Sequence, residues 1–164
     1  MADHSGFTAQ GTIDFNQNVI KKRGGICIVD ISSPVNLTSG NNTIISFNRE
    51  IYDPQGWHNN TNPSRITVPE DGVYKVEAHG RISDNPYGGI RLLALKKNGV
   101  IFLPTNNYGL ADVIEPLSTG WARVCLNFFW YLSLNANDYL EVYLYQNSGQ
   151  TLTMDYLMLA VSRV

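Results

Sequence analysis

The chain has 164 residues, a formal net charge of -2 and a charged fraction of only 16%, while its hydrophobic fraction is 43%. Soluble domains usually carry about 25% charged residues; here amides replace part of that charge, because the sequence holds 17 asparagines. The weakly acidic balance disfavours a nucleic-acid-binding protein, and no apolar run is long enough to span a membrane. We therefore expect one domain with neither nucleic acid nor membrane as a partner.

Residues 1–23 are polar, with isolated apolar side chains that include Phe7, Ile13 and Phe15. These are too few to build a core, so this segment is predicted to be an extended arm. The spaced aromatic side chains leave two alternatives open, a frayed terminus or a strap that becomes ordered on a partner. Residues 24–164 are expected to form the folded domain.

From Gly25 onward the chain reads as short β-branched or alternating segments separated by turn residues. The expected strands are residues 26–31, 43–47, 65–68, 74–82, 90–95, 100–103, 123–134, 139–145 and 152–161. Asn98-Gly99 is the typical signal of a tight hairpin turn. About eight to ten strands without a convincing helix predict an all-β, two-sheet sandwich.

Two consecutive strands are unusual because both of their faces are apolar or aromatic. Residues 124–132 alternate a core-like set with a set that contains Phe129 and Tyr131, and residues 139–145 set leucine and valine against Tyr139, Tyr143 and Tyr145. In a two-sheet sandwich only one face of each strand meets the core. The second face therefore lies under the long 104–120 loop or contacts another subunit; we favour an interface formed by these five aromatic residues.

No pattern indicates catalysis. The three histidines are not at metal-ligand spacing, and no phosphate loop, nucleophile elbow or zinc-protease helix occurs. Asp53, His58, Asn59 and Asn60 could hold calcium, but such a cluster is more often a turn. Cys27 and Cys125 are expected to be buried thiols, with a disulfide as the alternative. The sequence therefore predicts no enzyme, no metal and no cofactor.

Two segments resemble the complement C1q globular-head superfamily. The first runs from Phe47 to Tyr74 and includes Gly56-Trp57-His58; the second is Tyr131 to Val142. In the second, Asn137 stands where the family usually has glycine, and asparagine tolerates the left-handed backbone that this turn needs. The resemblance covers roughly residues 26–164. It implies a jelly-roll of about ten strands like that of tumour necrosis factor, and a homotrimer whose axis is lined by apolar and aromatic residues.

Neither a collagen-like stalk nor a signal sequence precedes the domain in this sequence, which disfavours a soluble ligand for a host receptor. Stand-alone domains with sequence motifs such as Tyr145-Gln146-Asn147-Ser148-Gly149 resemble bacteriophage virion proteins. The resemblance therefore implies a capsid decoration, or cement, protein on the outer surface of the phage head. Its partners would be the major capsid protein and neighbouring trimers, contacted through Phe7, Ile13 and Phe15 of the arm.

A second hypothesis is a trimeric receptor-binding or fibre-tip module that recognises carbohydrate on the host surface. It depends on aromatic side chains in predicted loops, because such rings can stack on sugars. The candidate glycan contacts are Trp57, Tyr87, Tyr108 and Trp121. Against this hypothesis, fibre tips usually follow a long shaft, and residues 1–23 are too short for one.

Overall fold

The computed structural model describes residues 25–83, 88–101 and 123–164, and in these ranges the chain forms eleven β-strands and no helix. The strands are β1 (Ile26–Asp30), β2 (Val35–Leu37), β3 (Asn42–Ile44), β4 (Arg49–Tyr52), β5 (Arg65–Thr67), β6 (Gly72–Ser83), β7 (Arg91–Lys97), β8 (Val100–Ile101), β9 (Val124–Leu134), β10 (Tyr139–Gln146) and β11 (Leu152–Arg163). The predicted all-β class is confirmed.

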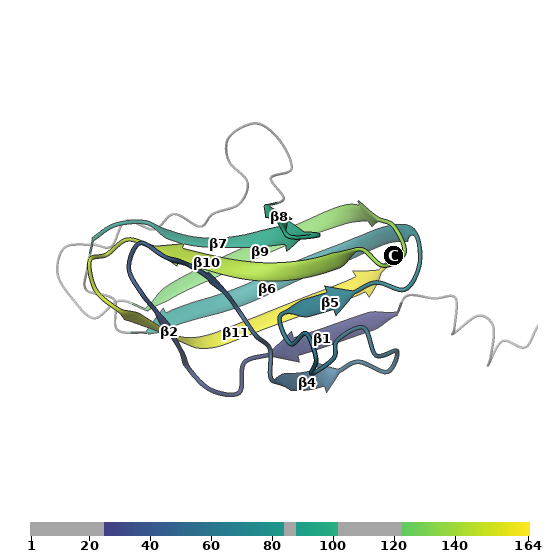
Figure 1. The fold of residues 1–164 in the computed structure, drawn as a ribbon, viewed down its shortest axis with the longest axis horizontal. Helices are drawn as coiled ribbons and strands as arrows, with labels where there is room; N and C mark the ends of the chain where they lie inside the picture. The colour runs from purple at the N-terminus through teal and green to yellow at the C-terminus, as the bar shows by residue number, and fades with distance from the viewer. Residues whose placement is uncertain (1–24, 84–87, 102–122) are drawn as a thin grey trace, which may run out of the picture.

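The strands form two sheets that lie one in front of the other (Figure 1). In sheet A the order is β4-β1-β11-β6-β9, and β2 pairs with β11; in sheet B the order is β3-β10-β7-β8, and β5 pairs with β10. All of these pairings are antiparallel. Strands that follow one another in the chain often lie in opposite sheets, so the two-sheet sandwich has the wound connectivity of a jelly-roll.

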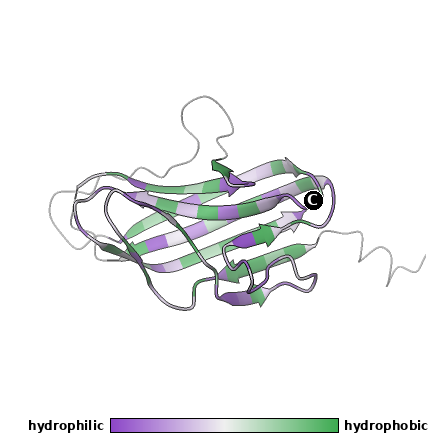
Figure 2. Cartoon of the chain, in the orientation of Figure 1, coloured by the Kyte–Doolittle hydropathy of each residue, from purple (hydrophilic) through white to green (hydrophobic). Residues whose placement is uncertain are grey.

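The long strands form because apolar residues recur at every second position, which suits a sheet with one buried face. Along β9 the burial alternates at every residue, with Leu126, Phe128 and Trp130 turned into the core. The same alternation of hydrophobic and hydrophilic residues is visible along other strands in Figure 2. The rings of Phe128 and Trp130 stack with their centroids 5.1 Å apart, so β9 supplies a large share of the aromatic core.

The turns follow the local sequence closely. Asn98 and Gly99 have φ angles of 52° and 78°, as the predicted hairpin turn requires, and Asn137 takes a φ of 69° in the turn between β9 and β10. Asp138 joins these two turns: one carboxylate oxygen accepts a hydrogen bond from the Asn98 amide at 2.6 Å, and the other lies 2.8 Å from the Lys97 ammonium. The β9–β10 crossover between the sheets is thereby fixed.

Two short strands are not predicted from the sequence. β2 has only three residues, and β4 lies in Arg-Glu-Ile-Tyr, where every residue is exposed. Val35-Asn36-Leu37 alternates but is too short to be recognised as a strand, and β4 has no apolar alternation. The described residues thus contain eleven strands where the sequence predicts eight to ten. β4 forms because β1 offers its edge for pairing, with Asp30 opposite Arg49 and Ile28 opposite Tyr52.

Candidate interaction surfaces

The outer face of sheet A, which we call face A, carries an exposed aromatic pair on its edge strand β9. Phe129 and Tyr131 are 51% and 59% exposed, and their rings meet edge to face with centroids 5.3 Å apart. The next strand, β6, sets Glu77 opposite Phe129 and Lys75 opposite Tyr131. Exposed aromatic rings beside a polar border are typical of protein interfaces.

The charged side chains of face A are paired within the chain. The Lys75 ammonium lies 3.0 Å from the Glu77 carboxylate and 5.4 Å from the centre of the Phe129 ring. Further along the same face, the guanidinium of Arg81 lies 2.8 Å from the Asp155 carboxylate. These charges largely neutralise one another, so face A presents aromatic surface with little net charge.

The outer face of sheet B, which we call face B, carries the three tyrosines of β10. The middle one, Tyr143, lies opposite Ile44 of β3 and Ala94 of β7. Tyr143 is only 4% exposed, and burial raises the pKa of its hydroxyl. Tyr139 and Tyr145 are half-buried. The Arg65 guanidinium covers the Tyr139 ring at 4.0 Å and donates to the Glu141 carboxylate at 3.0 Å.

The expectation that all five aromatic residues form one surface is wrong. β9 is the edge strand of sheet A and β10 is a central strand of sheet B, so Phe129 and Tyr131 point away from the sandwich on one side, while Tyr139, Tyr143 and Tyr145 belong to the other side. The sequence correctly indicates which residues of each strand share a face. It does not indicate that consecutive strands cross from one sheet to the other.

Trp57, a predicted glycan contact, is buried, with 4% of its surface exposed. Its indole packs edge to face on Tyr74 with ring centroids 5.7 Å apart, and it lies directly beneath Gly25: a Cβ added there would be 2.1 Å from the indole ring. Only glycine fits at that position. The loop folds back onto the core and carries Trp57 inward, so this residue cannot stack on a sugar and the prediction for it is wrong.

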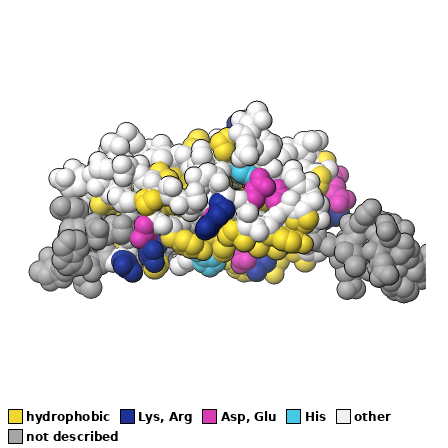
Figure 3. All heavy atoms as spheres, turned by 90° about the horizontal axis from the view of Figure 1, so that it is seen from below, with side chains coloured by type: hydrophobic (Ala, Val, Ile, Leu, Met, Phe, Trp, Pro, Cys, Tyr) yellow, Lys and Arg dark blue, Asp and Glu magenta, His cyan; other side chains and the backbone are white. Residues whose placement is uncertain are grey.

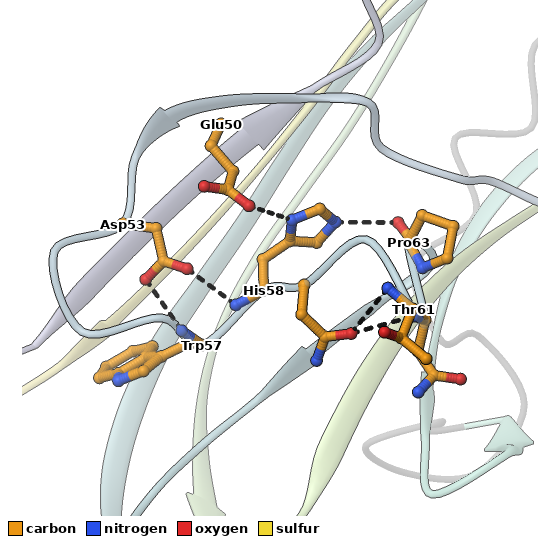
Figure 4. Close-up of polar contacts among 8 residues, drawn as sticks. Glu50, Asp53, Trp57, His58, Thr61 and Pro63 are labelled. Atoms are coloured by element: carbon orange, nitrogen blue, oxygen red, sulfur yellow. Dashed lines mark hydrogen bonds and ion pairs between the residues drawn. The ribbon is translucent and has the colours of Figure 1, made fainter.

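Asp53 and His58 hold this loop together (Figure 4). Both oxygens of Asp53 accept backbone N–H groups, from Trp57 at 3.0 Å and from His58 at 2.8 Å. The buried His58 ring lies between the Glu50 carboxylate, 2.9 Å from Nδ1, and the Pro63 carbonyl oxygen, which accepts from Nε2 at 3.1 Å. The Asn59 side chain accepts backbone N–H groups of the same loop. These donors and acceptors are used in building a turn rather than in a calcium cradle.

The cysteines differ from each other. Cys27 is buried, as expected, and burial together with the negative charges of Asp53 and Glu50 raises the pKa of its thiol. Cys125 is exposed on face A, so the expectation of a buried thiol is wrong for this residue; both cysteines are free, with no disulfide between them. The alternation of β9 places Cys125 on the outer side with Phe129.

Several predicted site residues lie outside the described residues. They are the arm residues Phe7, Ile13 and Phe15, the loop aromatics Tyr87, Tyr108 and Trp121, and the 104–120 loop that was the alternative cover for the aromatic face. Conversely, the structure shows exposed apolar residues that the sequence analysis missed, Ile44 on face B and Ile51 and Tyr52 on β4. β4 carries no periodic signal, and the predicted strand at residues 43–47 does not indicate that Ile44 faces solvent.

Within residues 25–83, 88–101 and 123–164, no group of three or more His, Cys, Asp or Glu side chains is arranged to hold a metal ion. In the same ranges, no helix has the length and apolarity needed to cross a membrane. Among the buried ionisable groups, Asp30 is paired with Arg49 and Glu141 with Arg65. The contacts of the described residues therefore account for these groups as structural elements.

Comparison with known proteins identifies the fold. No protein-family model matches the sequence, and no curated protein matches it. Among solved structures, the globular domain of zebrafish complement 1qA is similar with a TM-score of 0.56 and 14% identity, covering 85% of this chain and 96% of that one. Murine APRIL at pH 5.0 is similar with a TM-score of 0.57 and 12% identity, covering 87% of this chain and all (100%) of that one.

These similarities extend over most of the chain and over nearly all of each neighbour. At this low identity they show the fold alone. The protein therefore has the jelly-roll fold shared by the globular domain of complement 1qA and by APRIL, as the resemblance of its two sequence segments implies.

Proposed function

We propose that the protein is a non-catalytic structural module that associates into a homotrimer through face A. The observation that carries this proposal is the exposed pair Phe129 and Tyr131 on the edge strand of sheet A. About half of each side chain is still exposed, so burying the two rings at an interface is favourable by roughly 1 kcal/mol each. The homotrimer implied by the C1q-like resemblance supplies a symmetric partner for this surface.

Face B is the less suitable surface, because its aromatic side chains already have partners within the chain. Tyr143 is buried, and the Arg65 guanidinium covers the Tyr139 ring. In the proposed trimer, face A turns toward the threefold axis and face B turns outward. Of the five aromatic residues that the sequence analysis selects, Phe129 and Tyr131 therefore form the interface, and Tyr139, Tyr143 and Tyr145 stabilise the subunit.

We further propose that the trimer decorates the outer shell of a bacteriophage head between capsomers and binds the major capsid protein. Three features support this: the likeness of the sequence to stand-alone virion domains, a fold known from non-catalytic ligands, and a composition low in charge and rich in asparagine. A protein that binds only the assembled shell stabilises it by mass action, by about 2.7 kcal/mol per site when its free concentration is 100 times its dissociation constant.

Carbohydrate binding is the weaker of the two proposals. Trp57 is part of the core. The other three predicted glycan contacts, Tyr87, Tyr108 and Trp121, lie outside the described residues. No described residue provides an exposed ring in the loops where that hypothesis requires one.

The experiment that tests decoration combines purified shells with the full chain and with a variant that lacks residues 1–20. We expect the full chain to co-sediment with shells, to saturate at a number set by the capsomers, and to raise the temperature at which the shells break. The shortened chain should remain a trimer and lose binding. Equal binding of both chains would remove the arm from the mechanism, and a handful of copies per purified virion, measured by quantitative mass spectrometry, would contradict decoration.

A further inference from the structure

The β4 edge of sheet A is a second surface that lacks a partner among the described residues. Within residues 25–83, 88–101 and 123–164, β4 pairs only with β1, so its other backbone edge has no strand partner there. Exposed strand edges accept additional strands, and proteins usually guard them with charged side chains. On β4 both charges are turned to partners in the chain, Arg49 to Asp30 and Glu50 to His58.

With those charges paired, the rest of β4 is apolar. Ile51 and Tyr52 are 51% and 53% exposed, and a band of hydrophobic side chains runs along the molecule when it is seen from the side on which β4 lies (Figure 3). The pairing of β1 with β4 shifts register between Ile28 and Val29. The extra residue of this β-bulge is Ile51, which lies between the paired residues Glu50 and Tyr52 and has no partner on β1.

The chain itself contains a segment suited to this edge. In the arm, Thr12-Ile13-Asp14-Phe15-Asn16 alternates polar and apolar residues with the period of a strand. The nine residue-to-residue steps from Asn16 to Gly25 span up to roughly 30 Å when extended, so this segment can reach beyond its own domain. The arm joins the domain at the edge in question, because it leads into β1, the neighbour of β4.

The arm that pairs with β4 could come from the same chain or from another copy, and strand direction distinguishes the two. β1 and β4 are antiparallel, with Ile28 opposite Tyr52, so the arm enters β1 at the end of β4 that carries Tyr52. An arm that lay along its own β4 and led directly into β1 would therefore run parallel to β4. Every strand pairing in the described residues is antiparallel, and parallel pairing is slightly less stable per residue. To pair antiparallel with its own β4, the arm would need residues 17–24 to double back along that strand, whereas an arm from another copy needs no such reversal.

We propose that residues 12–16 of one copy add as an antiparallel strand to the open edge of β4 in a second copy, with Ile13 and Phe15 packing beside Ile51 and Tyr52. This β-augmentation uses main-chain hydrogen bonds for affinity and the alternate side chains for specificity. The inference deepens the self-association proposed above, because it assigns the arm a site on another copy of the chain.

The test places a photoreactive phenylalanine analogue at position 15 of the full chain and refolds an equal mixture of unlabelled and ¹⁵N-labelled protein before irradiation. Mass spectrometry of the cross-linked peptides should show the arm joined to the peptide that contains Ile51 and Tyr52, with about half of the linked pairs combining one labelled and one unlabelled chain, as random mixing of copies requires. Links to β4 without mixed pairs would show that the arm binds its own chain and would overturn the proposal, as would links to any other region.

Two double variants make the result specific. Ile51→Ser with Tyr52→Ser should reduce the mixed cross-link at least tenfold, and Val100→Ser with Ile101→Ser should leave it unchanged, because β8 is also an exposed apolar edge strand but belongs to sheet B. All four residues are exposed, so both variants should fold, which circular dichroism checks. Sedimentation of the same samples separates the two proposals: a monomeric mass contradicts the trimer, whereas the position of the cross-link decides on the β4 edge.

Discussion

The two outer faces of the sandwich both carry aromatic side chains at alternate positions of one strand, yet they use them differently. On face B, Tyr143 is buried and Tyr139 is covered by the Arg65 guanidinium, so the rings stabilise the subunit. On face A, Phe129 and Tyr131 contact each other and a lysine, and more than half of each side chain remains exposed. An aromatic strand face is therefore not by itself an interface. It is a candidate interface only where its rings remain exposed in the folded subunit.

The largest expected difference is in the free energy of unfolding, between alanine variants of Tyr143 and of Tyr131. Tyr143→Ala should lower the free energy of unfolding by about 3 kcal/mol, because it removes a buried ring. Tyr131→Ala should change the unfolding of the dissociated subunit by less than about 0.5 kcal/mol, because its ring is exposed. Urea unfolding of both variants in the same oligomeric state measures the difference, and equal losses would refute the distinction between the faces.

The crossover that joins the faces should be sensitive to acid. Burial raises the pKa of Asp138, but hydrogen bonds from Lys97, Asn98 and the Asn135 backbone outweigh it and lower the pKa from 3.8 to about 2. A lowered pKa stabilises the folded state above pH 3.8, and this contribution is lost as the pH falls from 3.8 to 2. It amounts to about 2 kcal/mol.

Asp138→Asn is the matched control for this pH dependence. Urea unfolding at a series of pH values should show that the unmodified chain loses more stability between pH 4 and pH 2 than the Asp138→Asn variant does. Parallel curves for the two chains would mean that Asp138 is not the group that titrates there.

A smaller difference in stability is expected between variants that break one ion pair on each face. Arg65→Ala leaves the buried Glu141 carboxylate with a single side-chain donor among the described residues, the Ser64 hydroxyl at 3.4 Å, and should destabilise the subunit by about 1–2 kcal/mol. Lys75→Ala breaks the more solvated Lys75–Glu77 pair on face A and should cost less than about 0.5 kcal/mol. Thermal unfolding of the two variants at one concentration ranks them, and the reverse order would show that face A contributes more to the subunit.

Much of the fold could be predicted from the sequence, because long strands with one buried face leave an alternating pattern. β6, β9, β10 and β11 are predicted within a few residues, as are the turns at Asn98-Gly99 and Asn137. What alternation does not encode is the sheet to which a strand belongs. It assigns Phe129 and Tyr143 to the outer side of their strands, but the crossover between β9 and β10 places them on opposite faces.

The candidate site was less predictable for a related reason. Trp57 lies in a polar, proline- and asparagine-rich segment, which predicts an exposed loop. Asp53 and His58 fold that loop back by binding its own backbone, and the absence of a side chain at Gly25 leaves room for the indole. Contacts between Gly25 and Trp57, far apart in the sequence, leave no local pattern. The exposed edge of β4 was not predicted because four residues are too few to show an alternating pattern.

The measurement that tests the central claim most directly is the mass of the protein in solution by sedimentation equilibrium. The unmodified chain of 18.3 kDa should sediment as three copies, about 55 kDa. Phe129→Glu combined with Tyr131→Glu should give a folded 18.3 kDa monomer, while Ile44→Glu on face B should remain a trimer. A mass of 18.3 kDa for the unmodified chain, or a trimer that survives the face A variant and dissociates with the face B variant, would contradict the account.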